Sequence, residues 1–409
     1  MVRRGSLFSQ LVALFDRRRF HELVIKHRAE RHCKGYSSWD QFIAMLFCQL
    51  AQAKSIREIC GGLACCEGKL RHLGMKKAPK KSTLSYANAH RPWRMYQDLF
   101  YETLDRCRHA APGKHKFRFK NKLLSLDSST ISLCLSMFPW AKFRRTKGAI
   151  KLHLLLDHDG YLPTYAYISN GKRHDVTVAR KVPLSPGSIV AMDRAYNDYG
   201  LLAHWTENKI NFVTRMKKNA VYRVVVDLKV PQHRNILSDQ LIDFTGPAGK
   251  KCPYGLRRIV VWDPRKQEKI VLLSNLLDFG ASTISTIYKD RWQIEIFFKT
   301  LKQNLKVKTF VGTTENALYT QIWTALIAML LIKYLHFKSV FGWCLSNLVA
   351  FLRWNLFTYR DLWEWIDRPF ETLPMEPGLV QDLLPLPGLG QQRRFGKGNL
   401  NLESSIIRS

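Results

Sequence analysis

The sequence predicts an α/β protein built around a mixed sheet, with helical regions before and after it. Three apolar strand patterns follow one another in residues 122–169, and two more alternate with short helical patterns up to residue 215. Helical patterns fill residues 1–112 and return after residue 275. Consecutive strands followed by alternating helices and strands are the order expected of a sheet covered by helices.

Residues 1–112 combine helix-cap signals with a basic loop. Ser55 and Glu58 form a capping-box pattern for a helix that is expected to stop at Gly61–Gly62. The basic loop 76–81 then leads into a short polar helix, residues 82–91. This order is typical of a helix-turn-helix-like DNA reader. A small helical bundle with a solvated loop explains the same residues equally well.

The strand patterns occupy residues 122–217 and a β-rich segment that follows them. Residues 157–160 are a turn signal, so the strands on either side of them are predicted to form a β-hairpin. Residues 218–274, with proline, glycine and basic loops between apolar runs, are interpreted as an inserted β subdomain. The predicted strands are residues 122–133, 149–157, 161–169, 188–193, 211–215, 221–230, 256–263 and 269–275.

One predicted helix, residues 288–305, places an acid among cations. At 100° per residue, five polar side chains fall within one wedge of about 80°, apart from a separate apolar face. They are Tyr288, Arg291, Glu295, Lys299 and Lys302. Ordinary surface ion pairs four residues apart would explain these charges on an isolated helix. The alternative is that this face presents an acid and several cations to a ligand.

The charge balance indicates a polyanionic partner. The formal net charge is +33 from 65 Lys and Arg against 32 Asp and Glu, and a basic surface binds phosphates by releasing their counterions. A membrane surface is the other option, but no basic amphipathic helix stands out as an anchor. The longest apolar run, residues 322–332, is too short to span a bilayer, so we expect a buried helix. No signal peptide is predicted at the N-terminus.

Cysteine usage favours a reducing cytosol. The chain has nine cysteines, an odd number without regular spacing, and it contains no C-x-x-C motif. A zinc site is a minor alternative, and its ligands would be Cys60, Cys65, Cys66 and His72.

Three carboxylates are the candidate metal ligands. Asp127 and Asp193 each end an apolar strand, and Glu295 lies on a helix that would pack beside both. Carboxylates that converge in a dry site repel one another, and divalent cations relieve this repulsion. Hard oxygen ligands suit magnesium or manganese, and two such ions can cleave a phosphodiester. Taken singly, Asp127 could merely shape a strand end, and Asp193 could be a helix N-cap.

The spacing of Tyr288, Arg291, Glu295 and Lys302 resembles the Y-(2)-R-(3)-E-(6)-K signature of one group of DDE transposases from bacterial insertion sequences. Residues 125–131 and 192–196 resemble the first and second aspartate blocks of that family, and residues 213–217 its following basic strand. The β-rich segment also lies where the group carries an insertion. The resemblance covers residues 114–337, and more loosely the N-terminal helices.

The resemblance implies a ribonuclease-H-like mixed sheet with an inserted β subdomain and a DNA-cleaving site. Asp127, Asp193 and Glu295 would bind two magnesium (or manganese) ions. The enzyme would nick the ends of its element, and the freed 3′-hydroxyls would attack target DNA. In cut-and-paste relatives a hairpin forms on the transposon end. Such enzymes act as homodimers on paired ends of double-stranded DNA, in the bacterial cytoplasm and nucleoid and at no membrane. The predicted DNA contacts are Tyr288, Arg291, Lys299, Lys302, Arg194, Arg215 and Lys217.

The predicted organisation has five parts. They are a helical end-binding domain (1–112), the first part of the core (113–217), the insertion (218–274), the second part of the core (275–338) and a helical C-terminal region (339–409) with a mobile tail from residue 385.

One departure from the family concerns a base-stacking tryptophan. Known relatives carry it at the start of the strand that here reads 269–275, where this sequence has Ile270. Trp262 or Trp292 could replace it, although a buried core position is the simpler interpretation of Trp262. Two alternative functions stay open: a metal-dependent nuclease without strand transfer, and a DNA-binding protein derived from a transposase.

Overall fold

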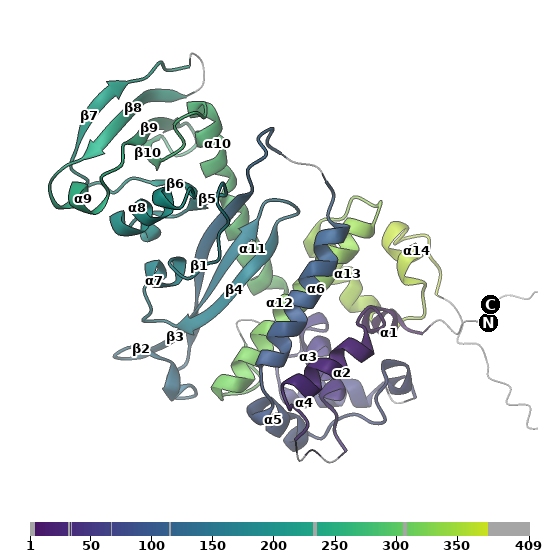
Figure 1. The fold of residues 1–409 in the computed structure, drawn as a ribbon. Coiled ribbons are helices and arrows are strands. Elements are labelled where there is room, and N and C mark those ends of the chain that lie inside the picture. Colours follow the sequence, from purple (N-terminus) through teal and green to yellow (C-terminus); the bar gives the residue numbers. More distant parts are fainter. Residues whose placement is uncertain are drawn as a thin grey trace, which may run out of the picture. The chain divides into compact units, whose positions relative to one another are not determined.

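The computed structural model describes residues 5–374, apart from positions 32, 34, 67, 114–115, 232–234 and 306–308 (Figure 1). The tail predicted to be mobile lies outside the described residues. The described part belongs to one compact unit that ends at Pro374.

Helices dominate both ends of this unit, and strands fill its middle. The α-helices are α1 Leu7–Val12, α2 Arg17–Lys26, α3 Ser38–Leu50, α4 Ile56–Ala64, α5 Lys81–His90, α6 Arg94–Ala110, α7 Asp175–Ala179, α8 Tyr199–Glu207, α9 Gly246–Lys251, α10 Ala281–Asp290, α11 Trp292–Asn304, α12 Glu315–Lys338, α13 Leu345–Asn355 and α14 Leu362–Asp367. Short 3₁₀ helices are η1 Leu70–Leu73, η2 Pro139–Ala141 and η3 Arg194–Tyr196. The strands are β1 Leu123–Leu133, β2 Lys142–Arg144, β3 Lys147–Asp157, β4 Leu162–Asn170, β5 Ile189–Met192, β6 Asn211–Arg215, β7 Tyr222–Asp227, β8 Ile236–Phe244, β9 Leu256–Asp263 and β10 Glu268–Ser274.

The ten strands form one mixed sheet, so the predicted α/β class is confirmed. Their order is β2-β3-β1-β5-β6-β10-β9-β8-β7, and β4 also pairs with β3. The β1–β3 and β3–β4 pairs are antiparallel, whereas β1–β5 and β5–β6 are parallel. The predicted β-hairpin across residues 157–160 is present as β3 and β4.

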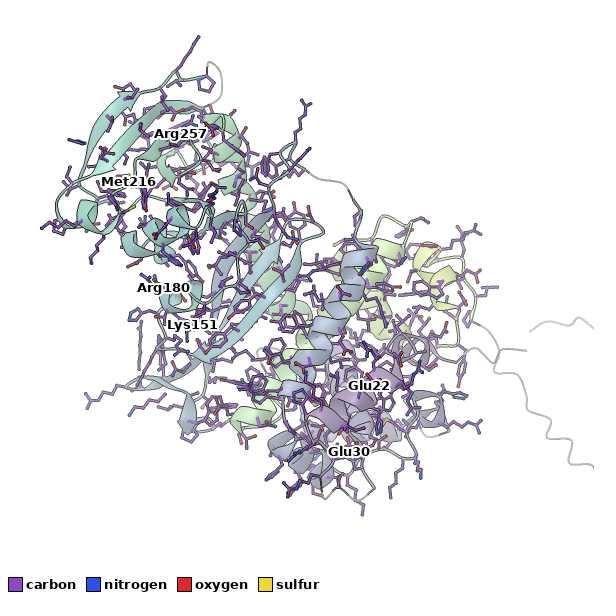
Figure 2. The ribbon with its side chains drawn as sticks, viewed as in Figure 1. Glu22, Glu30, Lys151, Arg180, Met216 and Arg257 are labelled. Atoms are coloured by element: carbon purple, nitrogen blue, oxygen red, sulfur yellow. The ribbon has the colours of Figure 1, made fainter. Side chains whose placement is uncertain are left out.

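The β-rich insertion differs from the prediction in two ways. It is continuous with the core sheet, because β10 pairs antiparallel with β6. It also contains a strand, β8, that the apolar pattern did not reveal, because a buried position of β8 is the acid Asp239. Arg257 on β9, labelled in Figure 2, pairs with this carboxylate at 2.8 and 2.5 Å, so the charge is matched by a residue 18 positions later.

Helices cover both faces of the core strands. On one face, Leu124 and Leu126 of β1 share a hydrophobic cluster with Trp205 of α8. On the other face, Leu123 of β1 shares a cluster with Ile284 and with Ile287 of α10. Side chains alternate along a strand, so β1 presents neighbouring residues to the two helical layers.

The N-terminal helices pack against the long helix α12. Trp323 of α12 is 1% exposed and contacts the rings of Trp93 and Phe100. Among the described residues, α12 alone is long and apolar enough to cross a membrane, but 89% of its most apolar window is buried inside the protein. It is a core helix, as expected from the sequence.

Two helix ends differ from the predictions. Helix α4 continues through Gly61–Gly62 to Ala64. A Cβ at position 62 would lie 2.9 Å from the ring of Phe47, so this glycine permits close packing and does not end the helix. The helix expected over residues 288–305 is divided at Arg291, where α10 ends and α11 begins.

Candidate active site

Strand pairing brings Asp127 and Asp193 to neighbouring positions. Leu126 of β1 pairs with Met192 of the parallel strand β5, so the next residues, Asp127 and Asp193, are neighbours on adjacent strands. Asp193 follows the end of β5 as predicted, whereas Asp127 does not end its strand, because β1 continues to Leu133 in its pairing with β3. The Asp193 side chain makes no hydrogen bond that caps η3. Its position before a helical turn therefore does not explain the acid as a cap.

The Asp127 carboxyl is largely buried, and this burial is the main influence on its pKa. Its side chain is 19% exposed, and its Oδ1 accepts a 2.8 Å hydrogen bond from the backbone N–H of Ser128. Burial raises the pKa of Asp127 to about 6. The Ser128 N–H and the Arg291 guanidinium lower the pKa, and the charges of Asp193 and Glu295 raise it.

Arg291 links the acid on the strand to the acid on the helix. Its Nη2 lies 2.6 Å from Glu295 Oε1, and its Nη1 lies 3.5 Å from Asp127 Oδ2. The interpretation of Arg291 and Glu295 as a surface ion pair is therefore incomplete, because Arg291 is buried and also faces β1. One cation is shared by two carboxylates from different elements.

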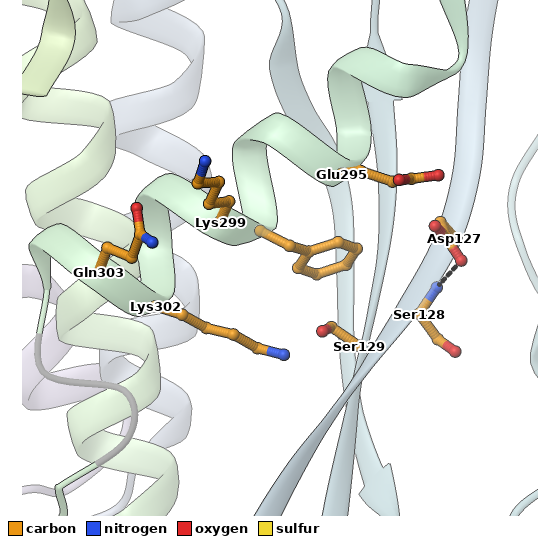
Figure 3. A pocket seen from close by; sticks show the side chains of 8 residues that line it. Asp127, Ser128, Ser129, Glu295, Lys299, Lys302 and Gln303 are labelled. Carbon is orange, nitrogen blue, oxygen red and sulfur yellow. Dashed lines mark hydrogen bonds between the residues drawn. The ribbon is translucent and has the colours of Figure 1, made fainter. Parts of the chain in front are cut away.

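A cleft of about 390 Å³ opens beside this bridge (Figure 3). Glu295 and Asp127 point toward one another across its rim, and the amino groups of Lys299 and Lys302 come from the same helix. Lys302 Nζ donates to the backbone carbonyl of Thr130 at 3.2 Å. The remaining lining residues are Ser128, Ser129, Phe298 and Gln303. The cleft thus combines carboxylates at one end with cations along its length.

The other predicted DNA contacts are distributed differently. Tyr288 is buried, and the guanidinium groups of Arg215 and Arg291 lie 5.6 and 5.5 Å from its ring centre. Lys217 lies over the ring of Tyr199, and Arg194 is exposed. Only Lys299 and Lys302 of this set line the cleft with Glu295, whereas Tyr288 and Arg291 support it from inside.

Sequence reasoning passed over a polar network on the other side of β1. Ser128 Oγ donates to Asp175 Oδ1 at 2.8 Å, and Lys151 Nζ lies 3.2 Å from the same oxygen. The buried Tyr196 hydroxyl lies near Asp175 and Asp127, and burial raises the pKa of Tyr196 well above the usual value. Ser128 was the sequence signal for this network. It directly follows Asp127 in a strand, so its side chain points to the opposite face of the sheet.

The donor set fits hard divalent cations. Carboxylate oxygens of Asp127 and Glu295 lie on either side of the Arg291 guanidinium, and Asp193 follows the strand next to β1, so the residue types present suit a hard cation. Within the described part of the chain, no three His, Cys, Asp or Glu side chains lie close enough to share a metal ion. The zinc ligands considered above form no such group either.

The two tryptophans considered for base stacking occupy different environments. Trp292 begins α11, three residues before Glu295, and is 55% exposed. Trp262 pairs with Lys269 in the β9–β10 ladder and is half-buried. Trp292 is therefore the one that stands next to the candidate site.

Fold and site define a class of protein: an α/β core with one acid within β1, a second directly after the neighbouring parallel strand β5, and a third on a helix packed against β1. The sequence profile of the family described as "Transposase DDE domain" matches residues 118–331, more than half of the chain. A domain of unknown function (DUF4372) matches residues 3–76. The chain therefore belongs to the DDE transposases of insertion sequences, which confirms the family expected from the motifs.

Relatives agree with this assignment. A protein of Geobacillus stearothermophilus named as a probable transposase for insertion sequence element IS5377 is 31% identical over 62% of this chain and 67% of its own length. A Sinorhizobium fredii protein named as a transposase, y4zB, is 30% identical over 68% and 77%. The cryo-EM structure of a piggyBac transposase synaptic complex with hairpin DNA aligns at a TM-score of 0.42 and 13% identity, covering 86% of this chain and 79% of that one, a likeness too distant to carry an argument.

Proposed function

We propose that this protein cuts DNA at the ends of its insertion sequence and joins those ends to target DNA. The observation that carries the proposal is the bridge from Asp127 through Arg291 to Glu295, at the rim of a cleft lined by lysines. A surface ion pair would not need two acids from separate elements. A site for a phosphodiester and its metal ions needs both signs of charge at this distance.

The three carboxylates, Asp127, Asp193 and Glu295, would hold two divalent cations, magnesium or manganese, whose chemistry is to activate the attacking oxygen and stabilise the leaving one. Arg291 would exchange its carboxylate partners for a DNA phosphate as the cations enter. Lys299 and Lys302 would hold the phosphates next to the scissile bond. Arg194, Arg215 and Lys217 would contact DNA further from it.

The arrangement of strands supports a ribonuclease-H-like core. The order β4-β3-β1-β5-β6, in which β4, β3 and β1 pair antiparallel and β1, β5 and β6 pair parallel, supports this proposal, with Asp127 on β1 and Asp193 directly after β5. Transposon-end binding is proposed for the N-terminal helices, where α5 exposes Tyr86 stacked on His90. A homodimer on paired ends and a nucleoid location in a bacterial cytoplasm belong to the same proposal.

A DNA hairpin on the transposon end is the finer part of the proposal. It needs an aromatic side chain for an extruded base, and the exposed Trp292 is favoured by its place beside the site. Replacement by Ala should then reduce hairpin products more than first-strand nicking.

The test is a cleavage assay with DNA that carries the element's own ends, magnesium, and either wild type or Glu295→Gln on a denaturing gel. Strand-specific cleavage that the substitution removes, while end binding survives, supports the metal site. Equal cleavage by both proteins would exclude Glu295 as a ligand. Cut ends that are never joined to target DNA would indicate a nuclease, and binding without any cleavage would indicate a DNA-binding protein.

A further inference from the structure

A second polar cluster lies beneath the junction of α10 and α11. Asp290, the last residue of α10, is 4% exposed, and its Oδ2 accepts from His158 Nδ1 at 2.6 Å and from the Tyr161 hydroxyl at 3.3 Å. Its Oδ1 accepts a bond from Lys116. The other ring nitrogen of His158, Nε2, lies 2.7 Å from Ser125 Oγ. His158, Tyr161 and Ser125 thus connect Asp290 of α10 with the β3–β4 turn and with β1, and Lys116 connects it with the segment before β1.

The β3–β4 turn that supplies His158 and Tyr161 is itself fixed. Gly160 and Tyr161 both have positive φ, +77° and +52°, so the turn is tight and holds a non-glycine residue in the left-handed region. Lys333 of α12, 7% exposed, donates its Nζ to the Gly160 carbonyl at 3.0 Å. A buried ammonium is costly unless it is hydrogen-bonded, and the Gly160 carbonyl of this turn accepts from Lys333. Lys333 therefore fixes the β3–β4 turn to the core helix α12.

The cluster runs alongside the carboxylate bridge. Ser125 and Asp127 lie two residues apart on β1 and face the same side. Asp290 immediately precedes Arg291, which contacts both Asp127 and Glu295. The same strand and the same helix junction are therefore joined twice, once through Asp127 and Arg291 at the rim of the cleft and once through the buried Ser125–His158–Asp290 cluster.

We propose that the Ser125–His158–Asp290 strut, resting on the β3–β4 turn, is a positioning device that sets the distance between the Asp127 strand and the Glu295 helix. This inference rests on the proposed function and adds residues that do not touch DNA. The helix is divided at Arg291, so the direction of α11 relative to α10 can vary at this break. The hydrogen bonds to Asp290 fix the end of α10 and therefore restrict that direction. A misplacement of about 1 Å in such a site can slow a reaction about 100-fold.

A hydrolase triad has the same order of groups, Ser–His–Asp, but it does not fit this location. The Ser125 side chain is fully buried, so no substrate carbonyl can reach its Oγ. A purely structural cluster is the remaining alternative, and the experiment is designed to separate it from positioning.

The test uses the full-length protein with Asp290→Asn and Ser125→Ala, which remove a charge or one hydrogen bond while leaving little empty volume. The matched control is Asp239→Asn, which breaks the buried Asp239–Arg257 pair on β8 and β9, outside the site. For each protein we would measure thermal unfolding, the single-turnover cleavage rate, and Mn²⁺ binding by the electron paramagnetic resonance of free Mn²⁺. The relevant Mn²⁺ binding is the part that Glu295→Gln abolishes.

The positioning role predicts that both strut variants weaken that Mn²⁺ binding several-fold and slow cleavage about 10- to 100-fold at a temperature where they remain folded. The control should lose stability but keep wild-type Mn²⁺ binding and rate. The inference is overturned if the strut variants unfold earlier yet bind Mn²⁺ and cleave like wild type when folded. If wild type binds Mn²⁺ at Glu295 but cleaves no DNA, the proposed function fails, and Mn²⁺ binding alone then decides whether the strut positions the acids.

Discussion

Asp127→Asn should stabilise the protein in the absence of metal. The substitution removes an ionisable group whose pKa rises from 3.8 to about 6 on folding, chiefly through burial. A rise of about 2 pKa units corresponds to about 3 kcal/mol at neutral pH. Asparagine retains an acceptor for the Ser128 N–H, so the backbone contact at 2.8 Å survives. The melting temperature should therefore rise by a few degrees.

The pH dependence gives this effect a definite sign. Below pH 3.8 the carboxyl is protonated in both states and costs nothing. As pH rises through 6, the unfolded chain ionises more readily than the folded one, so folded-state stability falls and then levels off. The advantage of Asp127→Asn should grow between pH 4 and pH 6 and stay constant to pH 8.

Urea unfolding followed by tryptophan fluorescence at several pH values is the assay, with Asp98→Asn as a control of opposite sign. Burial alone would raise the pKa of Asp98, but hydrogen bonds from Lys26 and His27 outweigh it and lower the pKa. The ionised Asp98 carboxylate therefore stabilises the folded protein above pH 3.8, and this stabilisation is lost as pH falls through the lowered pKa. Asp98→Asn should consequently destabilise the protein at neutral pH. Saturating Mg²⁺ should erase the gain of Asp127→Asn, because only wild type keeps that ligand. A gain that is equal at pH 4 and pH 8 would refute the reasoning.

Three further predictions follow from packing and charge. Gly62→Ala should cost about 1–3 kcal/mol through overlap with Phe47, whereas Gly61→Ala, with open space around its Cβ, should be neutral or slightly stabilising in thermal melts. Lys333→Met should raise the melting temperature at pH 7 more than at pH 10, because burial lowers the pKa of this lysine to about 8 and its cost fades as pH rises. Glutamine at the cleft cations Lys299 and Lys302 should reduce the salt dependence of DNA binding by up to about 0.9 per lost phosphate contact, while glutamine at Arg265 and Lys266 of the β9–β10 turn, which do not line the cleft, should not.

Patterns local in sequence predicted most of the core strands. Apolar runs bounded by turn residues identified β1, β3, β4, β5 and β6 because their buried faces are hydrophobic. Strand β8 was not predicted, because one of its buried residues is the acid Asp239. Asp239 can be buried because it pairs with Arg257, 18 positions later, and a local pattern does not reveal such a partner. Gly62 was interpreted as a helix stop for the same reason, since the Phe47 ring that requires it comes from another helix.

For the candidate site, too, local sequence patterns predicted some features and missed others. Residue spacing identified the acids and cations near Glu295, because helical periodicity projects them to one side. It could not show that Tyr288 and Arg291 are buried, since their burial depends on how the chain bends at Arg291. The Asp290–His158 contact joins residues 132 positions apart, and an aspartate at a helix end gives no hint of a distant histidine.

The pairing of β6 with β10 has a consequence for how this fold can vary. Arg215 and Leu272 lie directly opposite one another, so everything between them is topologically the loop of one antiparallel pair. Its two ends are only about 5 Å apart, the spacing of adjacent strands. Extra residues can be accommodated at the turns of this segment, since the entropy of closing a loop grows slowly with its length. Its strands cannot be removed as freely, because Ile236 and Ile259 share a hydrophobic cluster with Leu123 of β1 and Ile189 of β5. The insertion can therefore vary in its turns while the sheet that carries Asp127 keeps its core.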